Sequence, residues 1–213
     1  MEESNFMKTG TTTLGLICKE GIVLAADKRA TAGYLIAQKD TAKIVKVTDN
    51  IAVTMAGSAS DGQMLIRFLQ SEMRLKKIRT KRDVTVKEAA NLMARMVYNN
   101  VRTPSMLPGI SHFLMGGKDY VGFYLYDIFA DGTISEVKDF ISSGSGSVMV
   151  YGVLETIFKK DMSLDEGKKL AIKCVNAAVQ RDIASGNGID VFTITKQGAK
   201  KVFAKEFNTR IEA

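Results

Sequence analysis

Three consecutive threonines follow a glycine near the N-terminus, at Gly10-Thr11-Thr12-Thr13. A threonine hydroxyl is a weak nucleophile unless a base lies beside it. If the bond after Gly10 were cut, Thr11 would gain a free α-amine, whose reference pKa of about 7.7–8.0 suits a general base near neutral pH. Gly10 fits such a bond because glycine tolerates unusual dihedral angles. The same residues also fit an ordinary strand end, so the threonines alone leave two interpretations open.

Other common pairs of nucleophile and base fit the sequence poorly. Its single histidine, His112, lies between hydrophobic strand positions, where a structural role is favoured. The two cysteines, Cys18 and Cys174, lie far apart within apolar patterns typical of small buried residues in a reducing compartment. With one histidine to join them, a zinc site is nearly excluded. A hydrolase built on this chain would need a lysine, a carboxylate or an amine as its base.

Two charged residues stand at the ends of predicted strands. Asp27 directly follows the apolar run 22–26, and Lys43 directly precedes Ile44. A buried lysine stays charged only beside an acidic partner, so the two side chains would support each other if they met. Their spacing alone favours an ordinary surface pair.

Turns of small residues offer a second kind of chemistry. Residues 55–60 (MAGSAS) connect a predicted strand to a helix, and Gly144-Ser145-Gly146 precedes another helix. Free backbone N–H groups at such a helix start suit an oxyanion or a substrate carbonyl, although a simple tight connection is the commoner outcome. At the end of the last helix, Asp182 opposes the helix dipole, which indicates a local role for it near Ser185.

The periodicity of the apolar residues predicts the elements that position these groups. Strands are predicted at 14–18, 22–26, 44–47, 51–56, 113–115, 121–129 and 189–195, and helices at about 60–82, from Thr85, at about 150–157, and from Ser163 to about Arg181. This order is strands, two helices, strands, two helices, strands. It favours two antiparallel sheets face to face, with a helix pair on each outer side, over a parallel doubly wound sheet.

The bulk properties are those of one soluble domain. Of the 213 residues, 46% are hydrophobic and 25% are charged. No apolar stretch approaches the ~18 residues that a membrane helix needs, and the acidic, polar N-terminus does not resemble a secretory signal. We therefore predict a cytoplasmic protein that has no membrane contact.

The net charge of +7 raises the question of nucleic-acid binding. The densest basic run, from Arg74 to Arg82, closes a helical pattern, where positive side chains complement the helix dipole. No recognition motif accompanies it, so nucleic acid is not predicted as a partner.

A resemblance joins these separate signals. The residues that carry it are Gly10-Thr11-Thr12-Thr13-Leu14-Gly15, Ala25-Ala26-Asp27-Lys28-Arg29, Lys43, Met55-Ala56-Gly57, Gly144-Ser145-Gly146-Ser147, Tyr151-Gly152-Val153-Leu154-Glu155 and the run 180–186 (QRDIASG). In order and spacing they resemble the β subunits of the proteasome, most of all the archaeal form, over nearly the whole chain. That family belongs to the N-terminal nucleophile hydrolases. The resemblance implies an α+β fold, the four-layer αββα sandwich.

The resemblance also implies a role for each matched residue. Residues 1–10 would be a propeptide removed by autocatalytic cleavage between Gly10 and Thr11, and 11–213 a single catalytic domain of a threonine endopeptidase. Thr11 would be the nucleophile, Lys43 would lower the pKa of its hydroxyl, Asp27 would hold Lys43, Gly57 would stabilise the oxyanion, and Ser145, Asp182 and Ser185 would position the amine. Ala30, Val45, Met55 and Ala59 would line the specificity pocket, and the backbone of Thr31, Gly57 and Ala59 would pair with substrate. No cofactor is implied.

The implied partners are those of a closed chamber. Family members form seven-membered β rings, stacked face to face and flanked by α rings, with a regulatory ATPase acting through the α ring on unfolded polypeptides. The uncharged pocket predicts cleavage after apolar residues. Three alternatives remain: another N-terminal nucleophile amidase, a non-catalytic or poorly processed subunit of the β ring, and, least favoured, a nucleic-acid-binding module.

Overall fold

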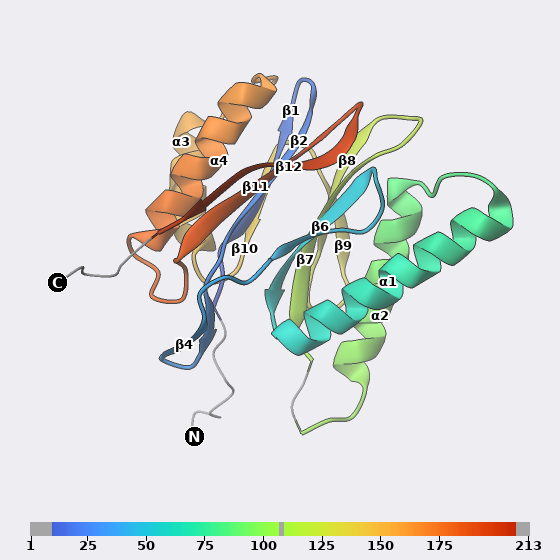
Figure 1. The fold of residues 1–213 in the computed structure, drawn as a ribbon, viewed down its shortest axis with the longest axis horizontal. Coiled ribbons are helices and arrows are strands. Elements are labelled where there is room, and N and C mark those ends of the chain that lie inside the picture. The colour runs from blue at the N-terminus through green and yellow to red at the C-terminus, as the bar shows by residue number, and fades with distance from the viewer. Residues whose placement is uncertain (1–9, 107–108, 208–213) are drawn as a thin grey trace.

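A computed structural model describes residues 10–106 and 109–207 of the chain. Two five-stranded antiparallel sheets lie face to face, and a pair of helices covers each outer face (Figure 1). This arrangement confirms the predicted four-layer αββα sandwich. Residues 1–9 of the predicted propeptide lie outside the described residues.

The first sheet joins the start of the described chain to its last third. Its strands are β1 (Thr13–Cys18), β2 (Gly21–Asp27), β10 (Phe140–Ser143), β11 (Gly188–Thr195) and β12 (Gly198–Glu206). They are ordered β10-β1-β2-β11-β12, and each pair is antiparallel. The helices α3 (Ser147–Ile157) and α4 (Leu164–Val179) cover the outer face of this sheet (Figure 1).

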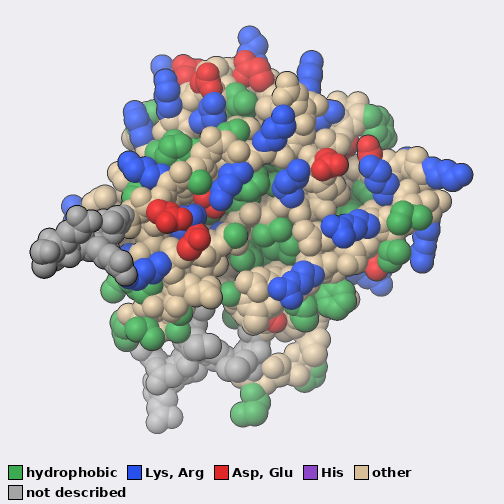
Figure 2. Space-filling model, viewed as in Figure 1, with side chains coloured by type: hydrophobic (Ala, Val, Ile, Leu, Met, Phe, Trp, Pro, Cys, Tyr) green, Lys and Arg blue, Asp and Glu red, His purple; other side chains and the backbone are tan. Residues whose placement is uncertain are grey.

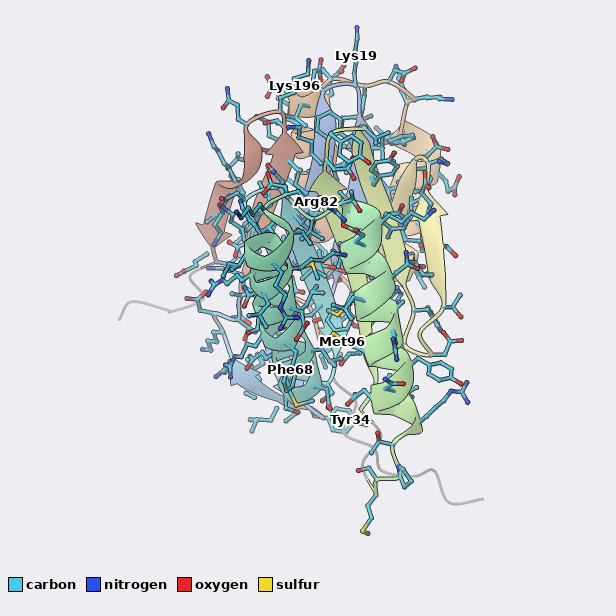
Figure 3. All side chains as sticks on the ribbon, turned by 90° about the vertical axis from the view of Figure 1, so that its right-hand side faces the viewer. Lys19, Tyr34, Phe68, Arg82, Met96 and Lys196 are labelled. Carbon is cyan, nitrogen blue, oxygen red and sulfur yellow. The ribbon has the colours of Figure 1, made fainter. Side chains whose placement is uncertain are left out.

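The second sheet follows the chain order. Its strands are β5 (Ile44–Lys46), β6 (Ile51–Gly57), β7 (Ser111–Lys118), β8 (Phe123–Ile128) and β9 (Ile134–Val137), each antiparallel to the next. The helices α1 (Ala59–Thr80) and α2 (Val86–Arg102) lie side by side across its outer face (Figure 3). The capping boxes predicted at Thr85 and Ser163 are both formed.

Three apolar layers hold the sandwich together. One lies between the second sheet and α1 and α2, one between the first sheet and α3 and α4, and one between the two sheets. Strand β2 shows how one segment serves two layers: Val23 faces the helices, whereas Leu24 faces the other sheet, and both are fully buried. Burial on both faces explains its unbroken apolar sequence, since alternation is expected only where one face meets water.

Five short or exposed strands are absent from the sequence prediction: β3, β4, β9, β10 and β12. The hairpin of β3 (Ala30–Ala32) and β4 (Leu35–Gln38) projects from the sandwich, and every residue of β4 is exposed. Strand β12 is mostly exposed, and β9 and β10 are each four residues long and only partly buried. These strands lack the continuous burial of β2 and β6, so their sequences contain no clear apolar run. The predicted strand 121–129 is shorter in the structure, at Phe123–Ile128.

The basic run at the end of α1 is largely paired with acids. Lys77 lies 2.6 Å from Asp83, and both Lys76 and Arg82 contact Glu88, at 3.0 and 2.6 Å. Figure 2 shows lysines and arginines spread over the viewed face, with acids between them. Among the described residues, no helix is both long and apolar enough to cross a membrane.

Both cysteines are buried in the layer between the first sheet and its helices, as the sequence predicted. Burial raises the pKa of the Cys18 thiol to about 11, with a smaller contribution from Glu20, and raises that of Cys174 to about 12. The reactive thiolate is therefore scarce in the folded protein at ordinary pH.

We expect neither thiol of the folded protein to react rapidly with iodoacetamide between pH 7 and pH 9, because both pKa values lie above that window. In denaturant, where a cysteine pKa is about 8.5, both should react, and the rate should rise with pH across the same window. Intact mass reports the number of added groups. Rapid, pH-dependent labelling of either folded thiol would contradict the burial of that side chain.

Candidate active site

Thr11 lies just before β1 and is 6% exposed. Its backbone nitrogen donates to Ser145 Oγ at 3.1 Å, and its carbonyl accepts from the backbone nitrogen of Gly146 at 3.3 Å. Between these contacts, Gly144 approaches so closely that a Cβ there would lie 2.1 Å from the Thr11 oxygen, and its φ is +95°. Glycine is therefore required at this turn, and the turn holds Thr11 from one side.

Asp27 and Lys43 form a buried ion pair, which overturns the surface pair that their spacing alone favoured. Lys43 Nζ lies 2.6 Å from Asp27 Oδ1, and the two residues are 4% and 1% exposed. Asp27 stands at the end of β2 in the first sheet, and Lys43 precedes β5 in the second. The two strand ends meet because the sheets stack, and sequence spacing carries no information about that stacking.

The Asp27 carboxylate accepts four hydrogen bonds. Oδ1 accepts from Lys43 Nζ and from the backbone nitrogen of Thr12 at 2.9 Å; Oδ2 accepts from the backbone nitrogens of Arg29 at 3.0 Å and Gly186 at 2.9 Å. Burial lowers the pKa of Lys43, and the charge of Asp27 opposes that effect. Lys43 therefore loses its proton more readily than a lysine at the protein surface does.

Ser145, Asp182 and Ser185 lie together beside Thr11. Asp182 Oδ2 accepts from the hydroxyls of Ser145 and Ser185, each at 2.6 Å. The Ser185 hydroxyl also lies 2.6 Å from Thr12 Oγ1. Thr12 thus belongs to this network through its side chain and to Asp27 through its backbone, and sequence reasoning did not single it out. Thr12 is fully buried, and its contacts with Asp27 and Ser185 can be recognised only in the folded structure.

A pocket opens at the junction of Gly10 and Thr11. Its lining residues are Gly10, Thr11, Ala30, Thr31, Thr41, Lys43, Met55, Ala56, Gly57, Ser58 and Ala59. It therefore collects most of the predicted substrate-binding residues. Val45 is not among them and packs against the core under α1 and α2. Thr41, Ala56 and Ser58 also line the pocket. The sequence pointed to residues 55–60 for their backbone N–H groups, but it did not predict Thr41, whose type does not distinguish it from an ordinary loop residue.

Glycine is required by space at two positions of this pocket. A Cβ on Gly57 would lie 2.3 Å from the backbone oxygen of Ile110, and the φ of Gly57 is +100°. A Cβ on Gly10 would lie 1.9 Å from Ala184 Cβ, so close approach demands glycine there, a reason that the sequence did not reveal. The backbone nitrogen of Gly10 donates to Thr31 Oγ1 at 3.2 Å, which holds the residue before Thr11 against β3.

Known proteins match this chain over most of its length. The family model described as "Proteasome subunit" matches residues 7–194. The chain is 42% identical over 198 residues to "Proteasome subunit beta" of Methanocaldococcus vulcanius, a match that covers 92% of this chain and 87% of the relative. It is 43% identical over 203 residues to "Proteasome subunit beta" of Ferroglobus placidus, covering 95% of each chain.

We expect Asp27→Asn to lower the free energy of unfolding by about 3–5 kcal/mol, because it leaves the buried Lys43 without a counter-charge. An asparagine also presents an NH₂ group where the native carboxylate faces donors, so the loss should persist at every pH at which Lys43 is charged. Denaturant unfolding followed by circular dichroism measures the change.

The matched control is Asp49→Asn, which removes a charge from an exposed pair with Lys46. It should change the free energy of unfolding by less than about 1 kcal/mol. Equal losses for the two variants would show that the Asp27–Lys43 pair is no stronger than a surface contact.

Proposed function

Because the chain belongs to the proteasome subunit family, we propose that it is a catalytic β subunit, a threonine endopeptidase that degrades unfolded polypeptides. One observation carries the proposal: a single pocket brings together the Gly10–Thr11 bond, Lys43 and Gly57. In this proposal residues 1–10 are a leader, and 11–213 form the catalytic domain.

The first reaction is removal of the leader by the chain itself. The Thr11 hydroxyl attacks the carbonyl carbon of Gly10 and gives its proton to a base, while the Thr11 nitrogen takes up a proton as its bond to that carbon breaks. The leader is then an ester on Thr11 Oγ1. Water hydrolyses the ester, which releases residues 1–10 with a new carboxylate and leaves Thr11 with a free amine.

Substrate hydrolysis repeats this chemistry on another chain. The Thr11 hydroxyl attacks a peptide carbonyl, the Gly57 N–H stabilises the oxyanion, and the leaving amine takes a proton before water hydrolyses the ester. Ser145, Asp182 and Ser185 hold the amine of Thr11, consistent with the contact between its nitrogen and Ser145. The hydroxyl proton passes to the amine, through a water, or to Lys43; the lowered pKa of Lys43 makes its neutral form easier to reach.

We further propose that the subunit works inside an assembly. Seven copies would form a β ring, two rings would stack, and α rings would flank them, with a regulatory ATPase acting through the α ring. Large apolar side chains that the isolated chain exposes support such contacts, among them Tyr34 on the β3–β4 hairpin and Phe68 on α1 (Figure 3).

Self-cleavage predicts a mass change that depends on one hydroxyl. When the chain is co-assembled with its α partner, its intact mass should fall by the mass of residues 1–10. Thr11→Ala should retain the leader, because the nucleophile is lost, whereas Thr11→Ser keeps a hydroxyl and should still lose it. Loss of the same leader from Thr11→Ala would mean that another protease cuts it. A wild-type chain that keeps its leader in a closed particle would favour the structural-subunit alternative.

The walls of the pocket predict which peptides are cut. Ala30, Met55 and Ala59 carry no charge, and Lys43, which also lines the pocket, is already paired with Asp27, so a charged residue entering beside these walls loses its hydration without gaining a free partner. Fluorogenic peptides ending in leucine, tyrosine or phenylalanine should therefore be cut at least about tenfold faster, in kcat/KM, than those ending in arginine or glutamate, a difference of about 1.4 kcal/mol.

Ala30→Asp provides the matched variant, since Ala30 is only partly buried and lines the pocket. It should shift the preference toward basic residues while cleavage still requires Thr11. Faster cutting of charged peptides by the wild-type particle would refute the apolar preference and leave the threonine mechanism standing.

A further inference from the structure

His112 links the two sheets through one ring nitrogen and is held within its own sheet by the other. It lies on β7 in the second sheet, and its Nδ1 is 2.7 Å from the hydroxyl of Ser143, on β10 in the first sheet. Its Nε2 is 2.5 Å from Asp127 Oδ1, on β8. The ring also packs edge-on against Phe129, at 4.9 Å between centroids. A structural role for this histidine was favoured by the sequence, and these contacts identify what it holds.

The three side chains resemble a serine-histidine-aspartate triad, but they do not form a second hydrolytic site. Ser143 is 2% exposed, so a peptide carbonyl cannot reach its hydroxyl. With a carboxylate at Nε2, that nitrogen donates, and in the neutral ring Nδ1 accepts the proton of Ser143. Asp127 therefore fixes the tautomer and the angle of the ring, and Ser143 is the group being held.

On one side of the link, Ser143 begins the turn that packs on Thr11. Ser143 is paired with Thr13 across β10 and β1. The next three residues are Gly144, in close contact with the Thr11 carbonyl, Ser145, which accepts from the Thr11 nitrogen, and Gly146, which donates to the Thr11 carbonyl. A shift of Ser143 would therefore move this turn and, with it, the backbone of Thr11.

On the other side, the backbone of His112 lies on the strand that pairs with the end of β6, where Gly57 stands. In the β6–β7 ladder, Ala56 is the partner of His112, and Gly57 is the partner of Ser111. One imidazole thus connects the turn that holds the proposed nucleophile to the strand end that carries the proposed oxyanion donor. Because an aromatic ring cannot lengthen or bend, the link sets a fixed spacing between the two sheets at this point.

We propose that His112 is a positioning residue that fixes the placement of Thr11 relative to the Gly57 N–H by linking Ser143 to the opposite sheet. The inference rests on the proposed peptidase function, because it assigns those two groups to the reaction. It does not require His112 to touch the substrate, and His112 is not among the residues that line the pocket.

Three substitutions separate the two ends of the link. His112→Leu removes both hydrogen bonds at similar volume. His112→Asn places an amide oxygen near the position of Nδ1 and can still accept from Ser143, whereas His112→Gln places its amide near Nε2 and can reach only Asp127. Each of the Asn and Gln variants keeps one of the two bonds. If the bond to Ser143 in the opposite sheet positions Thr11, His112→Asn should retain activity and His112→Gln should not.

In particles assembled with the α partner, His112→Leu and His112→Gln should lower kcat for a leucine-ending fluorogenic peptide by about 10- to 100-fold, since misplacement by about 1 Å is costly for catalysis. KM should stay within about twofold, because the pocket walls are untouched, and His112→Asn should recover most of kcat. Wild-type kcat in His112→Leu, or equal losses in the Asn and Gln variants, would overturn the proposal.

Hydrogen exchange gives a readout that needs no activity. The amides of residues 144–147 should exchange faster in the Leu and Gln variants and as slowly as in the wild type in the Asn variant. If a His112 variant fails to remove its leader while the amides of residues 144–147 exchange as slowly as in the wild type, the proposal is contradicted, because the loss of function would not come from this turn. If the wild-type particle has no activity that Thr11→Ala removes, the peptidase function fails, while the exchange result still decides whether the link holds the turn.

Discussion

The buried carboxylate of Asp27 is the contact on which the site depends. It accepts from Lys43 and from three backbone nitrogens, which belong to the start of β1, the end of β2 and the loop after α4. A buried charge is tolerated only when its partners are complete, so these segments must adopt one relative placement. The position of Thr11, directly before the residue that Asp27 holds, follows from this requirement.

Steric limits complete what the ion pair begins. Gly10, Gly57 and Gly144 each approach another backbone or side chain too closely to carry a Cβ. They lie on different segments, yet they surround one junction of the chain. The charge of Asp27 thus draws the segments together, and the missing side chains let them approach to contact distance.

The sequence predicts the fold better than the site. The apolar runs of β2 and β6 and the helical periodicity of the long helices each come from burial of one segment, and the two capping boxes are local, so all of these can be predicted from neighbouring residues. The burial of Asp27 with Lys43 is not local, because it arises from the stacking of two sheets. The resemblance implied that Asp27 holds Lys43, whereas their spacing alone favoured a pair at the surface. Thr12 and Thr41 were missed for the same reason, since only the assembled layers bring Thr12 to Ser185 and Thr41 to the pocket.

The connections around Thr11 span most of the described chain. Thr11 and Ser145 are 134 residues apart, and Asp27 and Gly186 are 159 apart. Contacts of such sequence separation form late in folding, because a long loop must close before they contribute. A partly folded chain therefore holds the threonine without its surroundings. For the nucleophile proposed above, this means that reaction at Thr11 waits for the complete fold, and an incompletely folded chain stays inert without any separate inhibitor.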